Sequence, residues 1–124
     1  MKKILKINPI PKPRMTRADT WKKRPCVLRY WAYKDELRIL LEENNISVKD
    51  NIWIEFHVAM PKSWSKKRKL QMNNQPHQNR PDVDNLLKGF MDAIFEEDCH
   101  IHTVYAKKFW SLEPLIVILD SQES

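Results

Sequence analysis

Prolines decide where this chain can form regular structure. Residues 2–8 alternate loosely between apolar and polar side chains, which predicts a short strand. Three prolines between residues 9 and 13 end that strand, because proline has no backbone N–H to pair inside a sheet. Pro61 and Pro81 enclose another segment with almost no apolar periodicity. We therefore expect an extended basic arm over residues 9–29 and a long basic loop, partly helical at most, over residues 61–81.

Two segments between these regions carry strong periodic patterns. Residues 29–44 place aromatic and leucine side chains at helical spacing, which is typical of a helix packed on a core. The members of this stripe are Tyr30, Tyr33, Leu37, Leu40 and Leu41. Residues 52–60 alternate apolar and polar side chains, which predicts a half-buried strand that ends at Pro61.

The chain after Pro81 predicts one more helix and two more strands. The helix begins near Asp84, and its expected buried stripe is Leu87, Phe90, Met91 and Ile94. Strands are expected over residues 103–110 and 115–119, the second being a short apolar run suited to a central position. The order strand, helix, strand, loop, helix, strand, strand predicts an α+β fold, with helices packed on a small mixed sheet. We expect a single domain over residues 1–124.

Charge indicates a polyanionic partner. The net charge is +6, and residues 1–34 hold eleven Lys or Arg against one acid. Residues 61–80 hold six against none. Basic side chains gain affinity for nucleic acid by displacing condensed counterions, although a solvated surface gives the same composition. No apolar run approaches the ~20 residues of a membrane span, so we expect a cytoplasmic protein with no membrane partner.

Acidic side chains concentrate in one place, on and after the sequence PDVDNLLKGFMDAI at residues 81–94. Six acids fall between Asp82 and Asp98. In an extended lead-in, the side chains of Asp82 and Asp84 point the same way, so both can bind one hard cation. Lys88 follows Asp84 by four residues and shares its helix face, with Asp92 four residues further on.

This pattern fits metal-dependent hydrolysis of a phosphodiester. Mg²⁺ prefers oxygen ligands, and a nearby lysine stabilises the charge that develops on the phosphate in the transition state. The same residues also have a structural interpretation. Asp84 is a common helix-capping residue, Lys88 can form surface ion pairs, and residues 96–98 can be an exposed acidic turn. The residues alone leave both interpretations open.

Two other chemistries have weaker support. A zinc site built from Cys99, His100, His102 and His77 lacks the usual ligand spacing. The single glycine, Gly89, lies inside a helix, so the chain has no glycine-rich phosphate loop and we expect no nucleotide cofactor.

Taken together, these motifs resemble the RusA-type Holliday junction resolvases, small endonucleases frequent in phages and prophages. The resemblance runs through PIPKPRMTR at 9–17, YWAYKDELR at 30–38, MPKSWSKKRK at 60–69, PH at 76–77, PDVDNLLKGFMDAI at 81–94 and EDCHI at 97–101. It implies a homodimer that recognises four-way junctions by shape and cuts them in pairs of nicks with Mg²⁺ or Mn²⁺. It also implies a role in recombination and repair or in phage DNA processing.

The resemblance assigns the site residue by residue. Its catalytic and metal-binding carboxylates fall on Asp82, Asp84 and Asp98, and its essential lysine falls on Lys88. The segment between Asp92 and Asp98 is shorter than in relatives, which leaves open whether Glu96 or Glu97 shares the role of Asp98. The expected DNA-binding residues are the basic side chains of the arm and the loop: Lys12, Arg14, Arg17, Lys66, Lys67, Arg68, Lys69 and Arg80.

Three rival functions remain at this point. One is a nuclease of the same fold that prefers forks, flaps or other branched DNA. Another is a non-catalytic protein that binds branched DNA, although all four expected active-site residues are present. The third is an interaction protein whose acidic turn and basic loop bind a protein partner.

Overall fold

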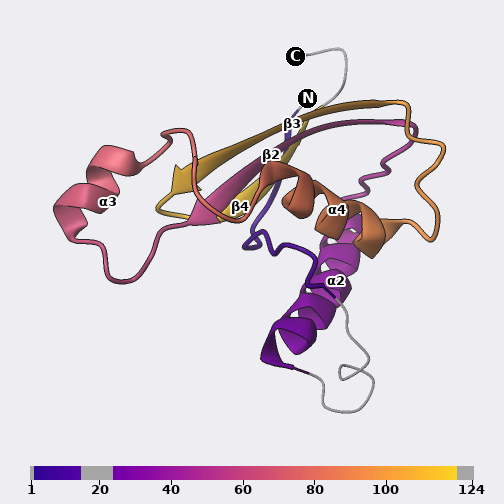
Figure 1. The fold of residues 1–124 in the computed structure, drawn as a ribbon. Coiled ribbons are helices and arrows are strands. Elements are labelled where there is room, and N and C mark those ends of the chain that lie inside the picture. The colour runs from indigo at the N-terminus through magenta and orange to yellow at the C-terminus, as the bar shows by residue number, and fades with distance from the viewer. Residues whose placement is uncertain (1, 15–23, 120–124) are drawn as a thin grey trace.

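The computed structural model describes residues 2–14 and 24–119 (Figure 1). In chain order its elements are β1 (Lys2–Leu5), α2 (Pro25–Glu43), β2 (Asn51–Ala59), α3 (Lys66–Met72), α4 (Val83–Ile94), β3 (Thr103–Ser111) and β4 (Leu115–Leu119). The expected α+β class and element order are confirmed. The loop expected over residues 61–81 contains α3, whose N-cap Ser65 accepts a hydrogen bond from the backbone N–H of Arg68 at 3.2 Å.

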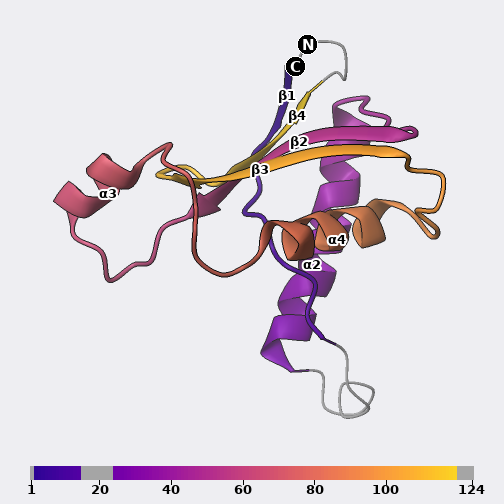
Figure 2. The same cartoon turned by 45° about the horizontal axis from the view of Figure 1, so that its top comes forward.

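Four strands form one mixed sheet in the order β1-β4-β2-β3. β4 lies between β1 and β2 and is antiparallel to both, as its continuous apolar run predicts. β2 and β3 are parallel and paired along their whole lengths, and the chain between them forms α3 and α4. α2 and α4 cover the same face of this sheet, and none of the helices in residues 2–14 and 24–119 lies on the other face (Figure 2).

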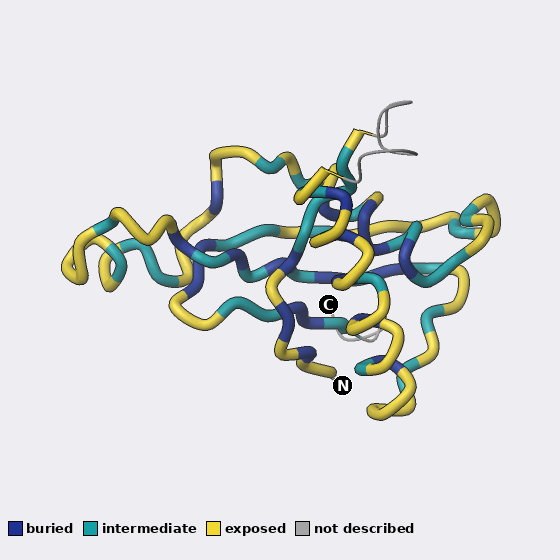
Figure 3. Tube along the Cα trace, turned by 90° about the horizontal axis from the view of Figure 1, so that it is seen from below, coloured by how far each residue is buried: buried dark blue, intermediate teal, exposed yellow. Residues whose placement is uncertain are grey.

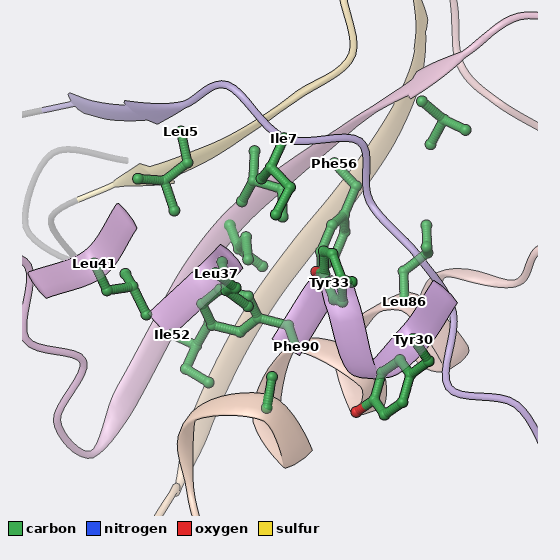
Figure 4. Packing of buried hydrophobic residues seen from close by; sticks show 14 residues of the cluster. Leu5, Ile7, Tyr30, Tyr33, Leu37, Leu41, Ile52, Phe56, Leu86 and Phe90 are labelled. Atoms are coloured by element: carbon green, nitrogen blue, oxygen red, sulfur yellow. The ribbon is translucent and has the colours of Figure 1, made fainter. Parts of the chain in front are cut away.

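The core lies between the sheet and these two helices. Alternate residues of β2 point into it, namely Ile52, Ile54, Phe56 and Val58, and all four are buried as their period predicts. From α2 come Tyr30, Tyr33, Leu37 and Leu41, and from α4 come Leu86 and Phe90 (Figure 4). The helix and strand predicted from the two strongest patterns are therefore confirmed, although Leu40 of the expected stripe is only partly buried.

Three expectations need correction. The strand expected over residues 2–8 ends at Leu5, before it reaches the first proline. The arm expected to be extended over residues 9–29 ends earlier, because α2 begins at Pro25, whose fixed φ suits the first turn of a helix. The buried face of α4 consists of Leu86, Gly89, Phe90 and Ala93, whereas Leu87, Met91 and Ile94 are only partly buried. α4 is thus rotated relative to the expected stripe, since the N-terminal arm also packs on it.

Burial differs sharply along the chain (Figure 3). α3 has no buried residue and lies away from the helices that cover the sheet. Across residues 2–14 and 24–119, no helix has the length and apolar character needed to cross a bilayer.

Candidate active site

The start of α4 presents two carboxylates to solvent. Asp82 is the N-cap residue in an extended conformation, and its backbone carbonyl accepts the first helical hydrogen bond from Leu86 at 3.1 Å. Its side chain makes no capping hydrogen bond, although capping is the usual structural role of an Asp at this position. Asp84 lies in the first turn, and both carboxylates are exposed. This end of α4 therefore has two acidic groups available to a ligand.

The chain reaches α4 along the edge of the sheet. We call residues 74–81 the return segment, because they lead from α3 back along β3. The backbone N–H of Asn74 donates to the carbonyl of Trp110 at 2.8 Å, and the N–H of Trp110 donates to Gln75 at 2.9 Å. The N–H of His77 donates to the carbonyl of Lys108 at 3.2 Å. The return segment is thereby attached to the end of β3.

A lysine of β3 continues this attachment with its side chain. The Nζ of Lys108 donates to the backbone carbonyl of Asn79 at 2.6 Å and to that of Pro81 at 2.7 Å. Burial lowers the pKa of Lys108, while the nearby negative charges of Asp82 and Asp84 oppose that shift. The basic group next to the carboxylate pair is therefore Lys108, a residue that the sequence motifs did not indicate.

A buried histidine also belongs to the return segment. His77 is only 3% exposed, and its ring lies 3.9 Å from the ring of Trp110, centre to centre. Its Nδ1 accepts a 3.4 Å hydrogen bond from the N–H of Asn79, so the proton of the neutral ring is on Nε2. Among the described residues Nε2 has no partner. Burial, and secondarily the charge of Lys108, lower the pKa of His77 below 6.5.

Aromatic contacts link this region to α3. The ring of Trp110 lies 4.8 Å from that of Trp64, which precedes α3. The guanidinium of Arg68, on α3 itself, lies 4.0 Å from the centre of the Trp64 ring. A continuous series of ring contacts thus connects the return segment with the exposed basic helix.

The other residues expected on the polar face of α4 have different surroundings. Lys88 is exposed and one helical turn from Asp84, as the spacing predicts. Asp92, two turns beyond Asp84, is partly buried and forms an ion pair with Lys12 of the N-terminal arm at 2.5 Å. Asp92 and Lys12 therefore attach the arm to the helix, and only Asp84 and Lys88 remain exposed on this face.

The arm crosses α4 at its single glycine. A Cβ on Gly89 would lie 2.8 Å from the backbone oxygen of Ile10, closer than real Cβ atoms come, so only glycine permits this approach. From the other side, the Tyr30 hydroxyl donates to the carbonyl of Gly89 at 2.9 Å. Burial raises the pKa of Tyr30 to about 12, which preserves the donor. These contacts fix α4 between the arm and α2.

Asp98 lies far from the other two predicted metal ligands in the same chain. It is in the loop between α4 and β3, whereas Asp82 and Asp84 are at the opposite end of α4. Twelve helical residues separate the two ends by about 18 Å. Over the described ranges, no three His, Cys, Asp or Glu side chains are grouped so that they could hold a metal. Asp98 is thus not brought to the pair within one chain, and neither are Glu96 and Glu97.

The zinc alternative is not supported by this arrangement. Cys99, His100 and His102 are exposed in the loop after α4, and His102 lies 3.9 Å from Asp50. His77 is attached to the other end of β3, at Lys108. The four residues therefore do not form one site.

The predicted DNA-binding residues divide into three groups. Lys66, Lys67, Arg68 and Lys69 are in α3, all but the last exposed, and Arg80 is exposed two residues before Asp82 in the sequence. In the arm, Lys12 is paired with Asp92, and the carbonyl of Arg14 accepts a hydrogen bond from Arg24 at 2.6 Å. Arg17 lies outside the described residues. Among the predicted DNA-binding residues that the structure describes, the largest exposed group is therefore on α3.

The donor chemistry of the pair fits a hard divalent cation. Asp82 and Asp84 offer only oxygen ligands, and among the described side chains neither carboxylate forms an ion pair.

The sequence contained a signal for Lys108 as well. Adjacent lysines in a strand must point to opposite faces, so one of Lys107 and Lys108 had to face the helices.

A protein-family model described as endodeoxyribonuclease RusA matches residues 6–119. A search of the curated proteins finds no match.

Proposed function

The chain belongs to the RusA endodeoxyribonuclease family, and on this basis we propose that it resolves four-way DNA junctions by metal-dependent hydrolysis of phosphodiesters. The observation that carries the proposal is the exposed Asp82–Asp84 pair, which stands at the start of a well-packed helix beside Lys108. A nuclease needs such a preorganised acidic group at the end of a rigid element.

Asp82 and Asp84 are the residues that would hold Mg²⁺ or Mn²⁺. When bound, the ion lowers the pKa of a water nucleophile and offsets charge on the phosphate. Lys88 lies one turn along α4 with its side chain exposed, so it can place a positive charge beside the phosphate oxygens. Together these residues supply acidic ligands and a basic group on one solvent-facing side of α4.

Basic side chains around the site would hold the DNA backbone. Arg80 is exposed two residues before Asp82, and α3 presents three exposed basic residues away from the core. Contacts of this kind fix the position of DNA without reading its sequence, which suits a protein that recognises branched shape.

We also propose that the active protein is a homodimer, because a two-fold protein matches a substrate cut in paired nicks. One surface supports this. In the described chain, the return segment covers the outer edge of β3 only at residues 108–110. The rest of that edge carries the exposed side chains of Val104 and Tyr105, and an uncovered strand edge with apolar side chains favours pairing with a second copy.

Pairing of two β3 edges also gives Asp98 a role. In an antiparallel pair, the start of one strand lies beside the end of the other, so the loop before β3 of one copy approaches Lys108 of its partner. Asp98 of the partner subunit would then complete the site that Asp82 and Asp84 begin.

Subunit mixing tests this arrangement. Asp82→Asn and Asp98→Asn proteins, each inactive alone, are unfolded together and refolded as a mixture. If Asp98 acts across the dimer, mixed dimers contain one intact site and make single nicks in a junction. No recovery, with dimers present, would contradict the shared site.

A panel of substrates tests the function itself. Synthetic four-way junctions, forks, flaps and linear duplex are incubated with the protein and Mg²⁺. We expect paired nicks, and the four-way junction should be cut faster than the other substrates. Preference for forks or flaps would assign another branched substrate. Tight junction binding without cleavage would assign a binding protein. If excess linear duplex fully displaced the junction from the protein, binding would depend on charge alone and not on branched shape.

A further inference from the structure

Two neighbouring lysines of β3 have opposite environments. Lys107 is exposed and in register with Glu55, on the face of the sheet opposite to the one that α2 and α4 cover. Its Nζ lies 5.2 Å from the centre of the Tyr105 ring. Lys108 is in register with Phe56, which is fully buried, and therefore points to the face covered by α2 and α4. Of the two lysines, Lys108 is the one that forms hydrogen bonds with the return segment.

Lys108 attaches the return segment at three points. Its backbone carbonyl accepts from the N–H of His77 at 3.2 Å, and its Nζ donates to the carbonyls of Asn79 and Pro81. Pro81 immediately precedes Asp82. The side chain thus holds the last backbone groups before the carboxylate pair, where the return segment leaves the edge of β3.

The pair needs such support for an electrostatic reason. Carboxylates that share one cation repel each other before it binds, and an exposed backbone can relieve the repulsion by turning one of them away. A cation beside the pair reduces the repulsion, and fixed carbonyls prevent the rotation. Lys108 does both, since the charges of Asp82 and Asp84 act on its ammonium.

We propose that Lys108 is a positioning residue of the nuclease site: by holding the carbonyls of Asn79 and Pro81, it keeps Asp82 and Asp84 in place to bind the metal. This inference rests on the proposed function. Lys108 differs from Lys88, whose side chain is exposed on α4 and free to reach DNA. Because the ammonium of Lys108 is engaged by two carbonyls, its effect reaches the substrate through the return segment.

Three variants test the inference. Lys108→Met removes the donors and the charge, Lys108→Arg restores both, and Lys107→Met is the matched control one residue away. The measurements are Mg²⁺ binding to the free protein by calorimetry, hydrogen exchange of residues 77–86, junction affinity without metal, and the Mg²⁺ concentration that gives half the maximal cleavage rate.

For Lys108→Met we expect Mg²⁺ binding weakened by about 10-fold or more, the scale for removing the support of a metal ligand. Exchange should accelerate in residues 77–86 and remain unchanged in β2 and α2, while metal-free junction affinity stays within about twofold of wild type. Lys108→Arg should recover most of the Mg²⁺ affinity, and Lys107→Met should behave as wild type.

Three outcomes would overturn the inference: Lys108→Met matching Lys107→Met in Mg²⁺ binding, exchange accelerated equally across the core, or no recovery with Lys108→Arg. Failure of the proposed function looks different. In that case the wild-type protein cuts no branched substrate, whereas Mg²⁺ binding and hydrogen exchange still decide the role of Lys108.

Discussion

α3 and α4 follow each other along the chain, yet the protein supports them in opposite ways. α4 buries Leu86, Phe90 and Ala93 against the core and has the arm packed across Gly89. α3 buries no residue, and its side-chain interactions include the Ser65 cap and the stacking of Arg68 on Trp64. Both helices carry charged residues that we assign to function.

The difference separates two kinds of task. Groups that act on a reacting phosphate must be held within a fraction of an ångström, so they belong on a rigid, buried element such as α4. Groups that only attract the DNA backbone tolerate movement, because a phosphate contact is mainly electrostatic. We therefore expect changes at the start of α4 to affect cleavage, and changes on α3 to affect binding.

The largest expected effect comes from Asp84→Asn. Asparagine preserves the helix start but removes a carboxylate charge, so the cleavage rate should fall by about 10²-fold or more. The matched control is Asp50→Asn, an exposed acid before β2 that should cleave normally. Rates under single-turnover conditions measure both. An equal fall in the two variants would mean that the overall negative charge of the protein, rather than the α4 pair, controls the cleavage rate.

A smaller effect is expected on α3. Replacing Lys66 and Lys67 by Gln should weaken junction binding and reduce the slope of log affinity against log salt by about 0.9 for each phosphate that α3 no longer neutralises. Replacing Lys2 and Lys3, also exposed, gives a control with the same charge change. Salt titrations of junction affinity distinguish them. If the two double variants behave alike, α3 has no special place in the interface.

The smallest effect concerns His77, the residue of the return segment whose ring contacts Trp110. Burial lowers its folded-state pKa, so below about pH 6.5 the unfolded chain binds a proton that the folded chain resists. His77 therefore makes the free energy of unfolding decrease as pH falls. His77→Phe keeps a ring against Trp110 and should flatten this dependence, whereas exposed His102→Phe should not. Denaturant melts between pH 5 and 8 measure it, and parallel curves for His77→Phe and wild type would refute the assignment.

Much of the fold could be predicted because its main elements have clear periods. The alternation in residues 52–60 and the Tyr30–Leu41 stripe depend only on which face is buried, and both are confirmed. α3 has no apolar stripe, so its short helix depends on a cap and a stacking contact that periodicity does not record. The rotation of α4 depends on the close approach of the arm to Gly89, a contact between segments distant in sequence.

The candidate site was also predictable only where its residues are close in sequence. Only one residue separates Asp82 from Asp84 along the chain, so the motif alone indicates their proximity. The position of Asp98 depends on the path of the chain around α4, and the segment is too short to bring it back within one subunit. Lys108 is 26 residues from Asp82 in sequence and reaches it only because the return segment follows β3. Spacing predicts neighbours on one element, but not contacts between elements.

The most direct test of the central claim is cleavage of a synthetic mobile four-way junction by wild type and Asp82→Asn, with and without Mg²⁺. We predict paired nicks that require the metal and disappear in the variant, while junction binding persists. Paired nicks that survive in Asp82→Asn at the wild-type rate would contradict the claim, because the reaction would then not depend on the acidic pair at the start of α4.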